Sequence, residues 1–181
     1  MDVVAVLLAA GAGRRYGSPK VLAHDGAWLR TAVTALADGG CAAVLVVLGA
    51  AIPAELPDGV STVLVQDWAS GMAASLRAGL AAASCTDATH ALMHLVDTPD
   101  VGADVVARVL ATGAELARAA YDGKPGHPVL LARQHWAAVG AVSSGDHGAR
   151  EFLRGREDVV LVECGDLATG RDHDRPGSEP V

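Results

Sequence analysis

The sequence is poor in aromatic residues and lacks long apolar runs. Its 181 residues include one Phe, two Tyr and three Trp, and the tryptophans are too widely scattered to form a stacking platform for nucleic-acid bases. No apolar stretch approaches the roughly 20 residues that span a bilayer. No basic segment precedes the short apolar run near the N-terminus, so we expect neither a membrane span nor a secretory leader.

Cysteine and basic residues are also scarce. Cys41, Cys85 and Cys164 are odd in number and form no CxxC pair, and they lie among alanines and valines. We expect packed, reduced thiols and a cytoplasmic protein. The chain has 14 Lys and Arg against 21 Asp and Glu, a net charge of −7, whereas nucleic-acid-binding proteins usually carry a basic stripe. The charge therefore argues against a nucleic-acid partner.

Several catalytic motifs are missing. There is no GxSxG elbow, so acyl transfer by a serine nucleophile has no starting point. His90 and His94 have the spacing of a helical metal pair, but their segment has the pattern of a strand and carries no acidic residue between them. Zinc is therefore disfavoured, because two histidines without a further ligand do not complete a site.

The sequence does contain an alternation of short β-branched runs with alanine-rich amphipathic segments, which is typical of βαβ units. No linker or repeat interrupts residues 1–181, so we expect a single α/β domain. The predicted strands are 3–8, 44–48, 60–65, 91–96, 128–131 and 159–162. The predicted helices are 28–37, 70–83 and one that begins the segment 104–120.

Two predictions concern the C-terminal third of the chain. Proline is confined to the edges or the first positions of strands, so Pro128 predicts an edge strand or a strand start at 128–131. From residue 165 onward the chain is polar and rich in Arg, Asp, Gly and Pro. We expect residues 165–181 to form a loosely ordered tail.

The most informative stretch is LAAGAGRRYGSPK, residues 8–20, which directly follows the first predicted strand. Its glycines allow positive φ angles and let backbone N–H groups approach an anion. Arg14, Arg15 and Lys20 supply the positive charge that a triphosphate needs. A glycine-rich turn with solvated basic residues remains the alternative.

This stretch differs from the two commonest phosphate-binding motifs. A Walker loop would require Ser or Thr after the lysine, but Val21 follows Lys20, and a dinucleotide fingerprint would require glycine in place of Tyr16. Pro19 lacks an N–H donor and does not continue a helix. We therefore expect the chain to stay extended after Pro19, so that Lys20 can reach back over the loop.

The stretch resembles the signature LAAGxxxRxGxxK of the MobA-like nucleotidyltransferases. The resemblance implies a three-layer, Rossmann-like nucleotidyltransferase fold with a mostly parallel central sheet. LAAG rather than LAGG resembles the members that use CTP rather than GTP, which places the choice of base at Ala10. The resemblance also implies nucleotide contacts from Leu8, Ala9, Ala10, Gly11, Ala12, Gly13, Arg15 and Lys20.

Asp97 follows the predicted strand 91–96 and precedes Thr98 and Pro99. Ligands of open α/β sheets bind at the carboxyl ends of the strands, and Mg²⁺ prefers hard oxygen ligands. A simple turn or helix cap remains the alternative. The segment resembles the DxP motif that holds Mg²⁺ in the family. Asp100 is expected to cap the helix that begins near residue 104.

Residues 66–80, QDWASGMAASLRAGL, resemble the family stretch ending in GMxxSLxxGL, which lies near the nucleotide. Gly71 and the small residues after it should present free N–H groups at a helix N-terminus, which is an anion site. Capping by Ser70 or Ser75 is the alternative. The resemblance adds Gln66, Gly71 and Ser75 to the predicted nucleotide contacts.

Residues 123–131 and 145–153 resemble segments of the cytidylyltransferase branch that acts on molybdopterin, and would face the second substrate. In the alternative these are loop residues and His127 packs locally. Near the C-terminus, RDHDRP keeps Asp172 and Asp174 of the family's DIDTPED, and either is expected to be a second metal ligand. The predicted acceptor-binding residues are Gly126, His127, Pro128, Gly145, Asp146 and Gly148.

The resemblance implies Mg²⁺-dependent transfer of CMP from CTP to the phosphate of molybdopterin or its molybdenum form, with release of pyrophosphate. Arg15, Lys20 and Asp97 would then be catalytic. Three alternatives stay open. The acceptor could be a sugar phosphate or another phosphorylated metabolite, the protein could be an NAD(P)H-dependent reductase on the same fold, or it could be a non-catalytic, cofactor-holding partner of a molybdoenzyme.

Overall fold

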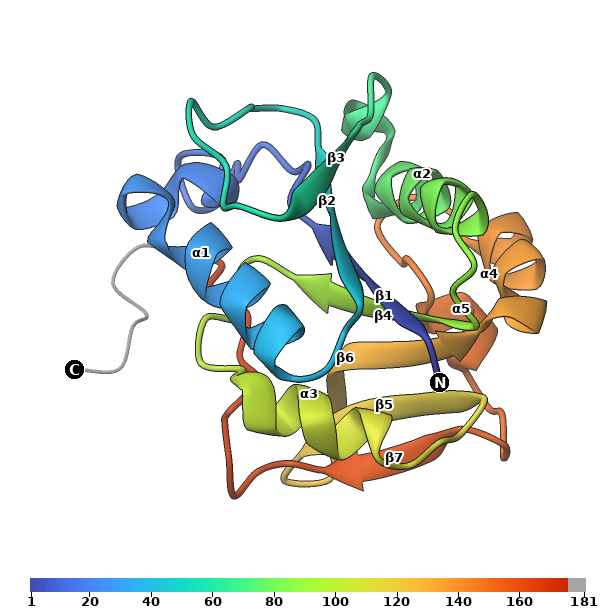
Figure 1. Cartoon of the computed structure of the whole chain (residues 1–181). Coiled ribbons are helices and arrows are strands. Elements are labelled where there is room, and N and C mark those ends of the chain that lie inside the picture. Colours follow the sequence, from blue (N-terminus) through green and yellow to red (C-terminus); the bar gives the residue numbers. More distant parts are fainter. Residues whose placement is uncertain (176–181) are drawn as a thin grey trace.

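The computed structural model describes residues 1–175, in which seven strands form one sheet of order β3-β2-β1-β4-β6-β5-β7 (Figure 1). Strands β3, β2, β1 and β4 run parallel to one another, and β6 is antiparallel to both β4 and β5. β7 is parallel to β5. The strands are β1 (Val3–Leu8), β2 (Ala43–Leu48), β3 (Val60–Leu64), β4 (His90–Leu95), β5 (Leu116–Tyr121), β6 (Lys124–Ala132) and β7 (Val160–Glu163).

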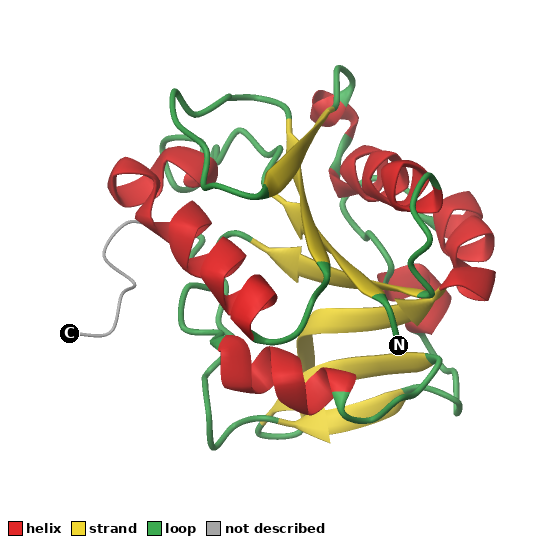
Figure 2. Ribbon diagram, in the orientation of Figure 1, coloured by secondary structure: helices red, strands yellow, loops and turns green. Residues whose placement is uncertain are grey.

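Helices cover both faces of the sheet, so the domain has three layers (Figure 2). Helices α1 and α3 lie on one face, and α2, α4 and α5 lie on the other. This arrangement confirms the predicted α/β fold. None of the helices in residues 1–175 is long and apolar enough to cross a membrane. The helices are α1 (Ala23–Asp38), α2 (Met72–Ser84), α3 (Ala103–Leu110), α4 (Trp136–Val142) and α5 (Arg150–Leu153).

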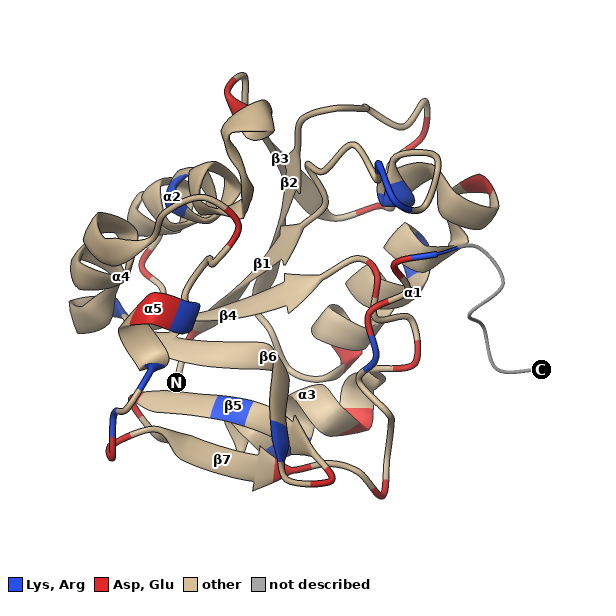
Figure 3. Cartoon of the chain, turned by 180° about the vertical axis from the view of Figure 1, so that it is seen from behind, with Lys and Arg blue, Asp and Glu red and all other residues tan. Residues whose placement is uncertain are grey.

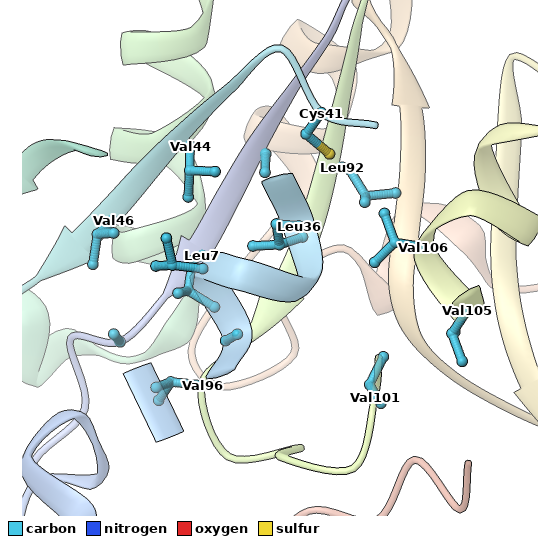
Figure 4. Close-up of a cluster of buried hydrophobic side chains, with 14 of the residues drawn as sticks. Leu7, Leu36, Cys41, Val44, Val46, Leu92, Val96, Val101, Val105 and Val106 are labelled. Carbon is cyan, nitrogen blue, oxygen red and sulfur yellow. The ribbon is translucent and has the colours of Figure 1, made fainter. Parts of the chain in front are cut away.

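The position of β1 inside the sheet explains why its sequence is entirely apolar. Successive residues of a strand point to opposite faces, and here both faces are covered by helices. Leu7 packs with Leu36 of α1 and Val106 of α3 in one cluster (Figure 4). Val6 belongs to the opposite cluster, together with Leu76 of α2. Burial on both faces holds the tip of β1, and therefore the loop that follows it, in a fixed place.

The segment 104–120 contains a strand that the sequence did not predict. Helix α3 ends at Leu110, and the turn that follows contains Gly113 at φ +60°. Residues Leu116–Tyr121, LARAAY, then form β5 between β6 and β7. Alanine favours helix locally, but pairing with two neighbouring strands decides the conformation here.

The strand predicted at 128–131 is present, but it is longer than expected, and Pro128 marks neither an edge strand nor a strand start. Strand β6 has nine residues and lies inside the sheet, between β4 and β5. Pro128 is tolerated there because it lies beyond the last residue pair with β4, which is Met93–Val129. It also falls where the register between β5 and β6 shifts. The missing N–H of the proline therefore interrupts no regular ladder.

The predicted loose tail is wrong for residues 165–175. His173 is buried, its N–H donates to the carbonyl of Asp97 at 3.0 Å, and its ring lies 5.4 Å from that of Trp28. Polar composition alone suggested disorder, but the polar groups find partners on the body of the domain. Residues 176–181, also part of that prediction, lie outside the described residues.

The three cysteines are free thiols. Cys41 and Cys164 are buried, as expected, and burial raises the pKa of the Cys41 thiol to about 12. Cys85 is exposed just after α2, so the expectation of packing is wrong for this residue.

Gly79 lies where α2 packs most closely on β1. A Cβ at this position would overlap Cγ1 of Val6, which is fully buried and stiff at χ1. We expect Gly79→Ala to lower the free energy of unfolding, because overpacking costs about 1–3 kcal/mol and exceeds the roughly 1 kcal/mol gain in helix propensity. Urea denaturation of the two proteins measures the difference.

Gly140 in α4 provides the matched control. A Cβ there would lie 3.7 Å from Cγ of Arg77, which is an ordinary contact with a flexible side chain. Gly140→Ala should therefore raise the free energy of unfolding by up to about 1 kcal/mol. Equal effects at both positions would contradict the close packing of α2 on β1.

Candidate active site

A cavity of about 620 Å³ opens at the carboxyl ends of β1 and β4, where open α/β sheets bind their ligands. Its size is typical of small-molecule sites. Five segments contribute to it: the loop after β1, the start of α2 with the residues just before it, the end of β4, the loop that carries Asp146 and the chain around residues 172–174. The predicted site residues that line it are Leu8, Ala9, Ala10, Gly11, Ala12, Gly13, Arg15, Lys20, Gly71, Ser75, Asp97, Asp146, Asp172 and Asp174.

The loop after β1 begins with two anchored residues. The N–H of Ala9 donates to the carbonyl of Val47 at 3.0 Å, and the carbonyl of Ala10 accepts from Ala50 at 2.9 Å. Both alanines are buried. The loop therefore leaves the sheet in a defined direction and is held against the end of β2.

Beyond Ala10 the loop exposes backbone to the cavity. Within residues 1–175, no hydrogen bond engages the N–H of Gly11, Ala12 or Gly13. Gly13 has φ +60°, and a Cβ there would collide with the carbonyl oxygen of Ser18. The turn thus requires glycine at position 13, and its free N–H groups suit an anion.

Lys20 starts a short 3-10 helix (Lys20–Leu22) directly after Pro19. The expected extended segment is therefore absent, but the lysine still reaches the site. Its Nζ donates to Oδ2 of Asp97 at 2.6 Å and to Oδ1 of Asp174 at 2.8 Å. The side chains of Lys20 and Asp97 are only 14% and 16% exposed, so this ion pair is screened less than a surface pair.

The charges of this cluster depend on one another. Burial opposes the charge of Lys20, but the hydrogen bonds to Asp174 and Asp97 outweigh it, and the pKa of Lys20 lies above its usual value. The hydrogen bond from Lys20 is the main cause that lowers the pKa of Asp174, and Arg15, whose Nη1 lies 3.5 Å from Asp174, contributes. Burial, and then the charges of Asp97 and Asp174, raise the pKa of Asp172 to about 6.

Three carboxylates thus share one end of the cavity, from the tip of β4 and from the C-terminal chain. Asp97, Asp172 and Asp174 supply hard oxygen donors, which suit Mg²⁺ or Mn²⁺ together with substrate phosphates. Lys20 donates hydrogen bonds to two of these carboxylates, those of Asp97 and Asp174. Within residues 1–175, no group of three or more His, Cys, Asp or Glu side chains is arranged to hold a metal ion by itself. The donor set fits a metal that arrives with a phosphate ligand.

The first N–H groups of α2 are hydrogen-bonded, although the sequence predicted that they would be free. The N–H of Met72 donates to Oδ1 of Asp146 at 3.4 Å, and that of Ala73 donates to the carbonyl of Gly145 at 2.9 Å. No serine caps the helix, because Gly71 occupies the N-cap position. The loop around Gly145 therefore satisfies the helix end and closes one side of the cavity.

The remaining predicted acceptor residues do not line the cavity. The carbonyl of Gly148 accepts from the Ser143 hydroxyl at 2.7 Å, and this glycine supports the loop without lining the cavity. Gly126, His127 and Pro128 lie on β6, outside the lining. The carbonyl of His127 accepts from the Tyr121 hydroxyl at 2.6 Å. Burial, then His94 and Arg118, lowers the pKa of His127 to about 3, which keeps its ring neutral.

Some lining residues were missed, and one predicted residue lies apart. Gln66 is exposed and outside the lining. Tyr16 and Met72, which the sequence did not suggest, line the cavity, and so does Trp68 of the segment 66–80 that was expected near the nucleotide. Trp68 packs against Gly49, where a Cβ would lie 2.6 Å from Cβ of Trp68. A glycine at the end of β2 thus leaves room for the indole.

Comparisons with known proteins agree with this geometry. The sequence profile of the MobA-like NTP transferase domain matches residues 5–160. The chain belongs to the MobA-like NTP transferase family. Nicotine blue oxidoreductase from Paenarthrobacter nicotinovorans is 38% identical over 189 residues, which cover 95% of this chain and 92% of that protein. The predicted family membership is therefore confirmed.

Solved structures of this MobA-like fold are similar as well. The homologue of Mycobacterium tuberculosis Rv0371c from Mycobacterium sp. strain JC1 has a TM-score of 0.79 and 27% identity, covering 96% of this chain and 90% of that one. Rv0371c from M. tuberculosis H37Rv in complex with manganese has a TM-score of 0.75 and 26% identity, covering 91% and 89%. A structural relative has thus been solved in complex with manganese.

The conformation of Gly13 can be tested by substitution. Gly13→Ala combines a positive φ, which costs about 1–3 kcal/mol in a non-glycine residue, with the clash against Ser18. We expect a fall in melting temperature of several degrees, measured by calorimetry. Gly11→Ala is the control, because a Cβ at Gly11 meets nothing within 4 Å, and its melting temperature should stay within about a degree. Equal shifts would contradict the loop geometry.

Proposed function

We propose that this MobA-like protein transfers a nucleoside monophosphate from an NTP, with CTP favoured, to the phosphate of molybdopterin or its molybdenum form. The observation that carries the proposal is the position of Lys20. It lies between Asp97 and Asp174 at the end of a glycine loop with free N–H groups. A cation, anion-binding N–H groups and metal-binding carboxylates then surround one polyphosphate.

The chemistry requires no protein nucleophile. An oxygen of the acceptor phosphate attacks the α-phosphorus of the NTP, a new P–O bond forms, and the bond to the β-phosphate oxygen breaks with release of pyrophosphate. An acceptor phosphate is already ionised near pH 7, so no general base is needed. Catalysis then consists of alignment and of charge neutralisation in a fixed electrostatic environment.

Each residue has a role that follows from its place. The N–H groups of Gly11, Ala12 and Gly13 bind phosphate oxygens, and Lys20 and Arg15 balance the charge of the triphosphate. Asp97, with Asp172 or Asp174, would hold Mg²⁺. The ion, when bound, neutralises charge on the phosphates and on the leaving group. Ala10, buried at the start of the loop, faces the base under this proposal.

A second candidate is an NAD(P)H-dependent reductase on the same fold. The observation that favours it is the name of the 38% identical relative, nicotine blue oxidoreductase. Against it, the loop lacks the third glycine of a dinucleotide fingerprint, because Tyr16 occupies that position. The three carboxylates and Lys20 also have no evident part in hydride transfer.

A thermal-shift panel separates the candidates. CTP, GTP, UTP, ATP and NADPH are added singly with Mg²⁺, since a ligand that binds only the native state raises the melting temperature. We expect the largest rise with CTP, about 2.7 kcal/mol of stabilisation at 100 times the dissociation constant. A response to GTP alone would overturn the cytidine assignment. A response to NADPH alone, with NADPH oxidation and no pyrophosphate release, would favour the reductase.

Asp97→Asn tests the transferase directly. Loss of one charged group at a transition state costs about 2.7–4 kcal/mol, so pyrophosphate release from CTP and molybdopterin should fall by two or more orders of magnitude. Asp38→Asn, at the exposed far end of α1, should leave the rate unchanged. Near-normal turnover of a folded Asp97→Asn protein would remove Asp97 from the mechanism.

A further inference from the structure

Residues 169–174, here called the C-terminal strap, carry Asp172 and Asp174 to the cavity. Figure 3 shows this part of the chain running past the tip of β4 toward α1, on the side of the molecule that holds the basic loop after β1. The strap has no helix or strand of its own. Its course therefore depends on contacts with the rest of the domain.

The strongest of these contacts is made by Asp100. Its Oδ2 accepts three hydrogen bonds, from the N–H of Thr169 at 2.7 Å, the hydroxyl of Thr169 at 2.6 Å and the N–H of Gly170 at 3.3 Å. Hydrogen bonds to an ionised acceptor are roughly twice as strong as those between neutral groups. Asp100 thus fixes the backbone at the start of the strap.

Asp100 does not have the role that its sequence position suggested. The N-cap of α3 is Gly102, with no side-chain cap. The first turn of α3 contains instead Asp104, whose Oδ1 accepts from the N–H of Val105 at 2.9 Å. Asp100 therefore does not cap α3, and its hydrogen bonds are made to the strap instead.

Further contacts with the domain hold the rest of the strap in place. Gly170 has φ +59°, and a Cβ there would overlap the ring of Tyr121, so the strap passes directly against β5. His173 then donates from its N–H to the carbonyl of Asp97 and packs on Trp28. These contacts lie on both sides of Asp172, so the two ends of the segment that carries the carboxylates are held.

We propose that Asp100 is a positioning residue, which acts through the strap to place Asp172 and Asp174 for a divalent metal. This inference rests on the proposed function. Asp97 and Asp100 belong to one short turn after β4, so that turn presents one carboxylate itself and aligns the other two. Groups that orient metal ligands typically contribute 10–100-fold to metal affinity or activity.

The geometry of Asp100 also predicts which substitution keeps its role. All three donors bind Oδ2, whereas Oδ1 is buried and has no partner within the described residues. Asparagine can place its carbonyl oxygen at the position of Oδ2 and keep all three hydrogen bonds. Alanine removes them.

The test measures Mn²⁺ binding by electron paramagnetic resonance, at a fixed concentration of CTP, together with hydrogen exchange of the strap in the ligand-free protein. In Asp100→Ala we expect Mn²⁺ affinity to fall about 10–100-fold and the amides of residues 169–173 to exchange at least about tenfold faster. Asp100→Asn should lie closer to the wild type than Asp100→Ala in both measurements, because the three hydrogen bonds remain although their acceptor is no longer charged.

Two further variants complete the design. Asp104→Ala removes a nearby carboxylate of the same charge that does not contact the strap, and it should change neither measurement. If Asp100→Ala does not fold, Thr169→Ala decides. Thr169 is exposed, and its substitution removes only the hydroxyl hydrogen bond. A several-fold loss of Mn²⁺ affinity is then expected, with Thr169→Ser close to wild type.

The outcomes separate this inference from the proposed function. Wild-type Mn²⁺ affinity in Asp100→Ala overturns the inference, whether or not the strap exchanges faster, and does so even if CTP turnover is found. If the wild-type protein shows no CTP turnover but Asp100→Ala weakens Mn²⁺ binding and loosens the strap, the proposed transfer reaction fails and the positioning role stands. If wild-type protein binds no Mn²⁺, the positioning role falls.

Discussion

The ammonium group of Lys20 joins three parts of the chain that are far apart in sequence: the loop after β1, the tip of β4 and the C-terminal strap. Without it, Arg15, whose Nη1 lies 3.5 Å from Asp174, would be left to balance the like charges of Asp97, Asp172 and Asp174. In the ligand-free protein the ammonium of Lys20 therefore stabilises the shape of the site. Under the proposed function it turns to the triphosphate, and the carboxylates it leaves become available to a metal.

The sheet makes this meeting possible. Because β1 and β4 are adjacent and parallel, their carboxyl ends lie side by side, and the residues that follow them are neighbours although about 80 positions separate them. Burial on both faces fixes the tips of these strands. The irregular parts of the site, the glycine loop and the strap, are thus supported by the buried strands, which is the arrangement that the proposed electrostatic catalysis needs.

What the sequence predicted well is what local pattern and charge determine. β1 is a continuous apolar run and β4 is apolar apart from His90 and His94, because both strands are covered on both faces, and the glycine loop and Asp97 follow their ends. β5 was missed because LARAAY favours helix until β6 and β7 pair with it. The order of residues 165–175 was missed because its causes, Asp100 and Tyr121, lie about 50–70 positions earlier in the chain and make contact only after folding. The side-chain-to-backbone bonds of Asp100 leave no signature in either segment alone.

The strap also determines when the site can be completed during synthesis of the chain. Lys20 is synthesised 154 residues before Asp174, so a domain that folds as a unit cannot complete this contact earlier. Until residues 169–174 have emerged, Lys20 can pair only with Asp97, and two of the three carboxylates are missing from the cavity. The electrostatic cluster therefore requires the chain as far as Asp174: a protein that ended before residue 169 would lack two of the three carboxylates.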